Sequence, residues 1–191
     1  MAITVADAAR ILEERGDLRR ARRDQSDWVI DFVSRLIGRP IPADLAEFYR
    51  ERIERIGDFG TTIPVWNDHV GRVTEDASIE TLLPAKAIPI FDDGCGSFFG
   101  VDISKTTDHP AVYFFDHESE FKYPAYAAGS SIATFLLLLA EHDTALHEKR
   151  PQAWELNIDP DLGRCPRAPR FGWPINWVLV PTPSYAPSSS A

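Results

Sequence analysis

The hydrophobic pattern of this chain changes its period near residue 60, and this change limits the folds that the chain can adopt. Before it, apolar residues recur at helical spacing in two segments, 28–37 and 41–57. After it come short runs rich in β-branched and aromatic residues, "TTIPVW", "AIPIF", "SFFGVDI" and "AVYFFD", separated by polar residues, Gly or Pro. Because no long helical crossover separates these runs, we expect an antiparallel meander of strands.

The helical segments carry their own boundary signals. The second opens with Pro42, whose missing N–H costs nothing in a first helical turn, and with Asp44, which favours the positive end of the helix dipole. Residues 4–23 predict a further short helix with an exposed, arginine-rich end. The sequence "GSSIATFLLLLAEHD" predicts a closing helix that is capped by Ser130 or Ser131 and packs on the sheet.

These elements predict a single α+β domain: N-terminal helices, a twisted antiparallel sheet of four to six strands, a C-terminal packing helix and an irregular arm rich in Pro and Trp. Eight of the 15 prolines and three of the five tryptophans fall between residues 151 and 187. We expect an N-terminal helical extension over 1–27, the main domain over 28–147, the arm packed on it over 148–180 and a disordered tail over 181–191.

The net charge of −9 is concentrated in the middle third of the chain. Residues 57–125 hold 4 basic and 12 acidic residues, whereas residues 1–56 hold 11 of each. A concentrated negative field repels nucleic acid and attracts basic partners. We therefore expect no nucleic-acid binding, and we consider two roles for the acidic segment: a surface for a basic protein partner, or an ordinary solvated face.

The apolar and cysteine patterns bear on location. The longest apolar run, "FLLLLA", is far shorter than the ~20 residues of a membrane-spanning helix. The two cysteines cannot build a disulfide framework, and two free thiols fit a reducing compartment. We expect a cytoplasmic protein that is not associated with membranes; its oligomeric state is left open.

The segment "PIFDDGCGSFFGVDIS", residues 89–104, favours a hairpin turn. In this interpretation Gly94 or Gly96 adopts a positive φ, and the acidic rim of the turn is available as a contact surface. A phosphate-binding loop is disfavoured, because the nearest charges are negative and a strand, rather than a helix, follows.

A metal site is a weaker alternative for the same region. It would use Asp92, Asp93 and Asp102 together with the cluster Asp116-His117-Glu118, since hard cations prefer oxygen ligands. The histidine of that cluster could also act as a general base, but no nucleophile accompanies it. A histidine that bridges a strand end to a neighbouring loop is the favoured interpretation.

Five short motifs occur in a familiar order over residues 28–143. They are Ile41-Pro42-Ala43-Asp44, Asp93-Gly94-Cys95-Gly96, Val101-Asp102, Phe115-Asp116-His117-Glu118 and Ser131 to Leu137. In this order they resemble the SUKH superfamily, which includes bacterial immunity proteins and fungal cell-wall regulators of the Smi/Knr type.

The resemblance implies a non-enzymatic immunity protein, without catalytic residues, metal or cofactor, that binds and blocks a cognate bacterial toxin through an acidic surface. A nuclease-type toxin fits, because substrate channels of nucleases are basic. The alternatives are a scaffold or regulatory protein-binding module of the same fold and a metal-dependent hydrolase. The expected partner-binding residues are the acids Asp68, Glu75, Asp76, Glu80, Asp92, Asp93, Glu118 and Glu120 and the aromatic anchors Trp66, Phe98 and Tyr123.

Overall fold

The computed structural model describes residues 3–22, 24, 26–57, 86–93, 96–121, 123–151 and 153–165. Its larger sheet within these residues has four antiparallel strands in the order β3-β4-β5-β6. The strands are β3 (Ala87–Asp92), β4 (Phe98–Asp102), β5 (Val112–Phe115) and β6 (Tyr126–Gly129). Neighbouring strands in the sheet are also neighbours in sequence, so the α+β class and the antiparallel sheet predicted from the sequence are confirmed.

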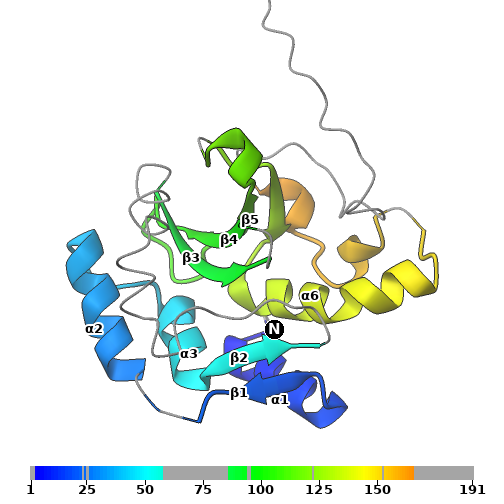
Figure 1. Ribbon diagram of the computed structural model, residues 1–191, viewed down its shortest axis with the longest axis horizontal. Helices are drawn as coiled ribbons and strands as arrows, with labels where there is room; N and C mark the ends of the chain where they lie inside the picture. The colour runs from blue at the N-terminus through cyan, green and yellow to red at the C-terminus, as the bar shows by residue number, and fades with distance from the viewer. Residues whose placement is uncertain are drawn as a thin grey trace, which may run out of the picture.

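The helical layer lies on one face of this sheet. Within it α6 (Ile132–His147) packs on the strands, α1 (Val5–Arg15) and α3 (Ala43–Glu51) pack against α6, and α2 (Ser26–Ile37) packs against α3. Figure 1 shows α6 between the larger sheet and the rest of the helical layer. A helix covered on two sides must be apolar almost all round, which explains the run "FLLLLA".

Aromatic side chains join the sheet to the helices. The ring of Phe135 in α6 lies 5.6 Å from the ring of Phe91 in β3 and 5.1 Å from that of Phe99 in β4. Phe48 of α3 contacts the other side of Phe91, at a centroid distance of 5.9 Å. All four side chains are completely buried, and they form the centre of a continuous core.

The predicted helices over 4–23 and 41–57 are wrong at their C-terminal ends. Helix α1 ends at Gly16, with a φ of 79°, and α3 ends at Arg52, with a φ of 51°. The residues that follow form β1 (Leu18–Arg20) and β2 (Ile53–Ile56), which pair as a two-stranded antiparallel sheet. The two isoleucines of β2 are three residues apart, which is also the spacing of one helix face. Both side chains are buried although the segment that carries them is a strand.

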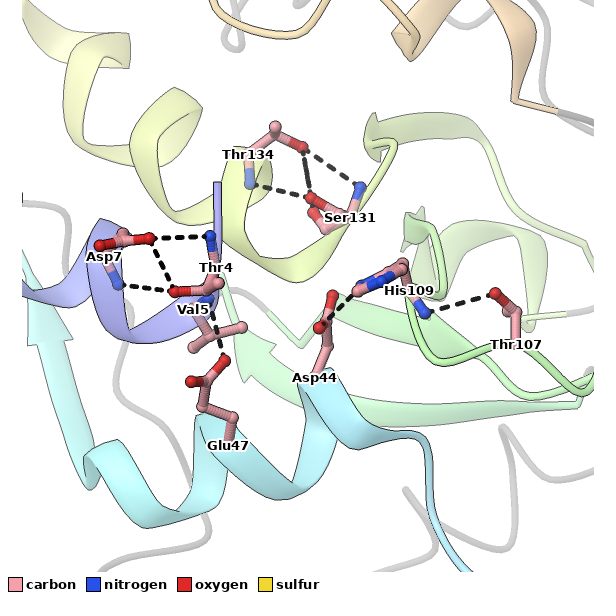
Figure 2. Close-up of polar contacts among 9 residues, drawn as sticks. All are labelled: Thr4, Val5, Asp7, Asp44, Glu47, Thr107, His109, Ser131 and Thr134. Carbon is pink, nitrogen blue, oxygen red and sulfur yellow. Dashed lines mark hydrogen bonds and ion pairs between the residues drawn. The ribbon is translucent and has the colours of Figure 1, made fainter. Parts of the chain in front are cut away.

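The N-termini of α1 and α6 are capped by side chains, as Figure 2 shows. Thr4 and Asp7 form a capping box: Thr4 Oγ1 accepts the Asp7 N–H at 3.1 Å, and the Asp7 carboxylate accepts the Thr4 N–H. Ser131 is the cap of α6, and its Oγ accepts the Thr134 N–H at 3.2 Å. Of the two caps expected for the closing helix, the structure uses the second.

The described part of the arm packs on the domain. It contains two short 3₁₀ helices, η3 (Trp154–Asn157) and η4 (Leu162–Arg164). Trp154 is buried, with the Arg150 guanidinium 5.5 Å from its ring centre. Residues 166–191, which comprise the rest of the expected arm and the expected tail, lie outside the described residues. Within the described part, no helix combines the length and apolar composition that crossing a membrane requires.

Asp44, at the start of α3, is fastened to the loop that joins β4 to β5. Its Oδ1 lies 2.9 Å from His109 Nδ1, and its backbone N–H donates to the carbonyl of Asp108 at 3.1 Å. The Asp44 side chain is buried, whereas the His109 side chain is exposed. Burial raises the pKa of the Asp44 carboxyl, and the lowering effect of His109 does not offset it.

We predict that Asp44→Asn is at least as stable as the wild type at pH 7, whereas Asp44→Ala loses about 1–3 kcal/mol. Asn keeps the acceptor for His109 without a buried charge, and Ala removes the acceptor. Because the pKa of Asp44 is raised in the folded protein, its ionised carboxylate lowers the free energy of unfolding at a pH above that pKa. This loss of stability disappears as the pH falls through the pKa and the carboxyl is protonated. Urea unfolding of the three proteins should therefore show the Asn advantage shrinking from pH 7 toward about pH 4. An Asn variant as unstable as the Ala variant would contradict this account.

We predict that Gly129→Ala destabilises the protein by about 2–4 kcal/mol. Gly129 ends β6 just before α6, and a Cβ at this position would lie 2.6 Å from Cβ and 2.8 Å from the backbone N of Phe135. The matched control is Gly163→Ala in η4, where a Cβ would meet no atom within 4 Å, and we expect a change of at most about 0.5 kcal/mol. The midpoints of urea unfolding of the two variants are compared. Equal destabilisation of both would show that the close approach of Phe135 to Gly129 does not determine the stability.

Candidate functional site

The turn between β3 and β4 is closed by Asp93 and Ser97. The Asp93 N–H donates to the Ser97 carbonyl at 3.1 Å, and Asp93 Oδ1 accepts the Ser97 N–H at 2.9 Å. Gly96 has a φ of 98°, a left-handed conformation that glycine adopts without steric cost. Gly94 lies outside the described residues. The carboxylate therefore helps to shape the turn and is held at its rim.

The 3₁₀ helix η2 (His117–Ser119) is attached to this turn. His117 Nδ1 lies 2.8 Å from Ser97 Oγ, and the His117 backbone N–H donates to the same oxygen at 3.2 Å. Asp116 caps η2, with its Oδ1 accepting the Glu118 N–H at 2.9 Å. His117 thus bridges a strand end to a neighbouring loop, and the contact brings two separate acidic segments of the chain together.

A buried phenol shows how close the two segments lie. Burial raises the pKa of Tyr126 well above its ordinary value, and the carboxylates of Asp93 and Asp116 both raise it further. Both carboxylates are therefore near enough to act on the same hydroxyl, which stays protonated. We call the surface formed by Asp93, Asp116, Glu118 and Glu120 the acidic turn surface; its two aspartates are half-buried, and its two glutamates are exposed.

The chain leaves η2 through an unusual backbone. Glu120 and Phe121 are consecutive non-glycine residues with φ values of 53° and 55°, a conformation that costs about 1 kcal/mol or more for each residue. The contacts that hold it include a hydrogen bond from the Glu120 N–H to the His117 carbonyl at 2.9 Å, another from the Phe121 N–H to the Asp116 carbonyl at 3.4 Å, and the Phe121 ring 5.6 Å from the ring of Phe98. Backbone strain of this kind is common at binding sites.

The structure brings together some of the residues predicted for partner binding. Asp93, Glu118, Glu120 and Phe98 meet at the acidic turn surface, and Asp92 precedes it as the last residue of β3. Tyr123, two residues after Phe121, is 57% exposed. The predicted residues Trp66, Asp68, Glu75, Asp76 and Glu80 lie outside the described residues.

The sequence analysis named Asp116 only as a metal candidate and as part of a family motif, and it did not name Ser97 or Phe121. The position of Asp116 could have indicated its role, because an aspartate directly after a strand often caps the turn or helix that follows. The sequence carries no such signal for Ser97 and Phe121, because their roles depend on η2 folding back over the turn.

The carboxylates named for a metal site are not all at one place. Asp102 pairs with Ala87 at one end of β4, whereas Phe98 at the other end pairs with Asp92. Asp102 is thus separated from the turn by the length of the strand. In the portion of the chain that the structure describes, no group of three or more His, Cys, Asp and Glu side chains is arranged to hold a metal ion.

Ser97, His117 and Asp116 do not have the geometry of a nucleophile and its base. A relay uses both ring nitrogens, one for the nucleophile and one for the carboxylate. Here Ser97 Oγ, at 2.8 Å, and Asp116 Oδ1, at 3.6 Å, both approach Nδ1 of His117. Ser97 is also buried. These contacts brace the surface and do not activate the serine.

The comparisons with known proteins agree with the order of elements. The family model described as the SMI1/KNR4 family (SUKH-1) matches residues 26–137. No curated protein and no solved structure shows significant similarity to the chain. The matched segment runs from α2 into α6, contains the whole four-stranded sheet and the acidic turn surface, and leaves out α1, β1 and the arm. With more than half of its length matched, and with helices followed by an antiparallel meander and a closing helix, the chain belongs to the SMI1/KNR4 family (SUKH-1).

Proposed function

We propose that this chain is an immunity protein that blocks a cognate bacterial toxin by binding it, without catalysing a reaction. Family membership supports this proposal, since proteins of the SUKH group bind partner proteins. The observation that carries it is the acidic turn surface, where Asp93, Asp116, Glu118 and Glu120 from two distant segments gather at one end of the sheet.

The chemistry of this surface suits a basic partner. Glu118 and Glu120 are exposed, so their negative charges lie at the surface, where cationic groups of another protein can approach them. A nuclease toxin presents a basic channel because phosphate contacts dominate its affinity for substrate. Carboxylates placed over such a channel compete with the substrate, and their field accelerates the encounter.

The surface is also held rigid before any partner arrives. Two hydrogen bonds close the turn, the Ser97–His117 contact fastens η2, and the Phe98–Phe121 ring contact fixes the chain beyond it. A preorganised surface loses less conformational entropy on binding. The exposed Tyr123, close by in sequence, is the aromatic anchor that we propose beside the carboxylates.

We predict that reversing the charge of the two exposed glutamates weakens toxin binding. The tagged wild-type protein is used to capture its partner from native cells, and association rates are then measured with the captured toxin domain. Glu118→Lys/Glu120→Lys should slow association about tenfold at low salt, and the difference should shrink as salt is added.

The matched control is Glu14→Lys/Asp31→Lys, which changes the net charge equally at side chains that are 64% and 65% exposed on α1 and α2. We expect less than a twofold effect for this control. Equal slowing in both variants would mean that the total charge matters and the acidic turn surface does not. A capture that recovers no toxin domain, with no toxin gene beside this one, would refute the proposed function, and recovery of several endogenous proteins would favour the scaffold alternative.

We also predict that inhibition is stoichiometric. Toxin activity titrated with this protein should fall linearly and reach its minimum at one equivalent, because a blocking protein is occupied by the toxin that it inhibits. Loss of activity at far lower ratios would show that this protein transforms the toxin, and would contradict a binding mechanism.

A further inference from the structure

A cavity of about 350 Å³ lies at the opposite end of the β4 and β5 strands from the acidic turn surface. One wall is the loop 103–111 between the two strands, and the other is the end of the described arm, around η4. Since four residues separate Phe98 from Asp102 along β4, the two sites are about 14 Å apart. The volume falls within the ~300–1,000 Å³ typical of small-ligand sites.

The loop wall is held in place by the helical layer. Arg39, which follows α2, donates from Nη1 to Thr106 Oγ1 at 2.7 Å and from Nη2 to the carbonyl of Lys105 at 3.2 Å. The Asp44–His109 contact holds the other end of the loop, as Figure 2 shows. The side chains of Lys105, Thr107 and His109 line the cavity from this fixed backbone.

The arm wall is held by a buried carboxylate. Asp159 is 1% exposed and accepts three hydrogen bonds: from the Ser130 N–H at 2.6 Å, from Ser130 Oγ at 2.6 Å and from Thr134 Oγ1 at 2.9 Å. These contacts fasten the arm to the start of α6. Asp161, Arg164 and Cys165 then line the cavity. This wall lies outside the segment matched by the family model, so the cavity is a feature of this chain that the family match does not assign.

The acids that line the cavity are already engaged within the protein. Asp102 accepts the Ser104 N–H at 2.7 Å, and Asp161 accepts a hydrogen bond from Arg164 at 2.6 Å. Asp161 therefore has a cationic partner before any ligand binds, and Asp102 is held by a backbone N–H.

The cationic side chains keep donors available. Lys105 forms no ion pair with any residue that the structure describes, and its ammonium group has three donors. One nitrogen of the Arg164 guanidinium forms an ion pair with Asp161, and the Arg164 side chain is 83% exposed. Thr107 Oγ1 accepts the His109 N–H, which leaves its own hydroxyl proton to donate. Among the lining residues Lys105 and Arg164 balance the charges of Asp102 and Asp161, so the cavity is close to neutral in a chain whose net charge is −9, and its remaining donors are those of Lys105, Arg164 and Thr107.

The charge of Lys105 reaches the arm wall. The pKa of the Cys165 thiol is raised to about 11 by burial first and by Asp159 and Asp161, while Lys105 acts in the opposite direction. The ammonium group of one wall therefore interacts with the thiol of the other. A ligand in the cavity would meet cations from both sides.

We propose that this cavity binds an oxyanion, a carboxylate or a phosphate group, between Lys105 and Arg164. Oxyanions accept several charge-assisted hydrogen bonds at once, and two walls that are already fixed lose little entropy on binding. This site is independent of the toxin-binding role proposed above, because it uses different residues at the opposite end of the sheet.

The test is a titration of the full chain, labelled with ¹⁵N, with inorganic phosphate and separately with succinate at constant ionic strength. Saturable shifts of backbone amide signals confined to residues 103–109 and 161–165 are expected. The anion that binds with the higher affinity shows whether the cavity prefers a phosphate or a carboxylate group. Shifts that do not saturate with either anion, or that spread over the arginines of α1, would overturn the proposal.

Three variants complete the test. Lys105→Gln and Arg164→Gln change exposed side chains, so the fold is retained, and each should weaken binding about tenfold. Arg10→Gln on α1, also an exposed cation, is the matched control and should bind as the wild type does. Unchanged affinity in both cavity variants would overturn the assignment.

Discussion

The contact between α6 and the four-stranded sheet is the interaction on which the rest of the structure depends. Phe135 packs against Phe91 and Phe99, and the helix can approach this closely because Gly129 has no side chain at the point where β6 meets α6. Once α6 lies on the sheet, its second face is available to α1 and α3. Helix α6 therefore links the sheet to α1 and, together with the Phe48–Phe91 contact, to α3, and burial of its apolar surface supplies the driving force for these contacts.

The meander sets the separation between the two surfaces that we propose to be functional. Antiparallel strands joined by short connections place alternate turns at opposite ends of the sheet. The β3–β4 turn meets η2 at one end and forms the acidic turn surface, and the β4–β5 loop meets the arm at the other end and forms the cavity. The two sites differ in charge because different loops supply their side chains, while the strands between them are buried.

The polar contacts near the acidic turn surface support a role in binding. Ser97, His117 and Asp116 resemble the components of a hydrolytic site in type, but their geometry makes them a brace between a turn and a 3₁₀ helix. The same brace positions exposed carboxylates on a rigid base. A surface of this kind suits binding to a basic protein. Such binding requires charges held in fixed positions, and no covalent bond is made or broken.

The sequence by itself determined the α+β class, the antiparallel meander, the closing helix with its serine cap and the family, because hydrophobic period and turn residues act over short distances along the chain. It misplaced the ends of α1 and α3, where the buried isoleucines of β2 mimic helical spacing, and it did not predict β6, whose "YAAG" has low strand propensity. Tertiary structure alone decided that Asp93 and Asp116 act on one hydroxyl, that Ser97 is a brace and that the arm completes a cavity. Each of these facts depends on segments 20 or more residues apart meeting in space, and such meetings are set by the packing of the whole core and leave no local pattern in the sequence.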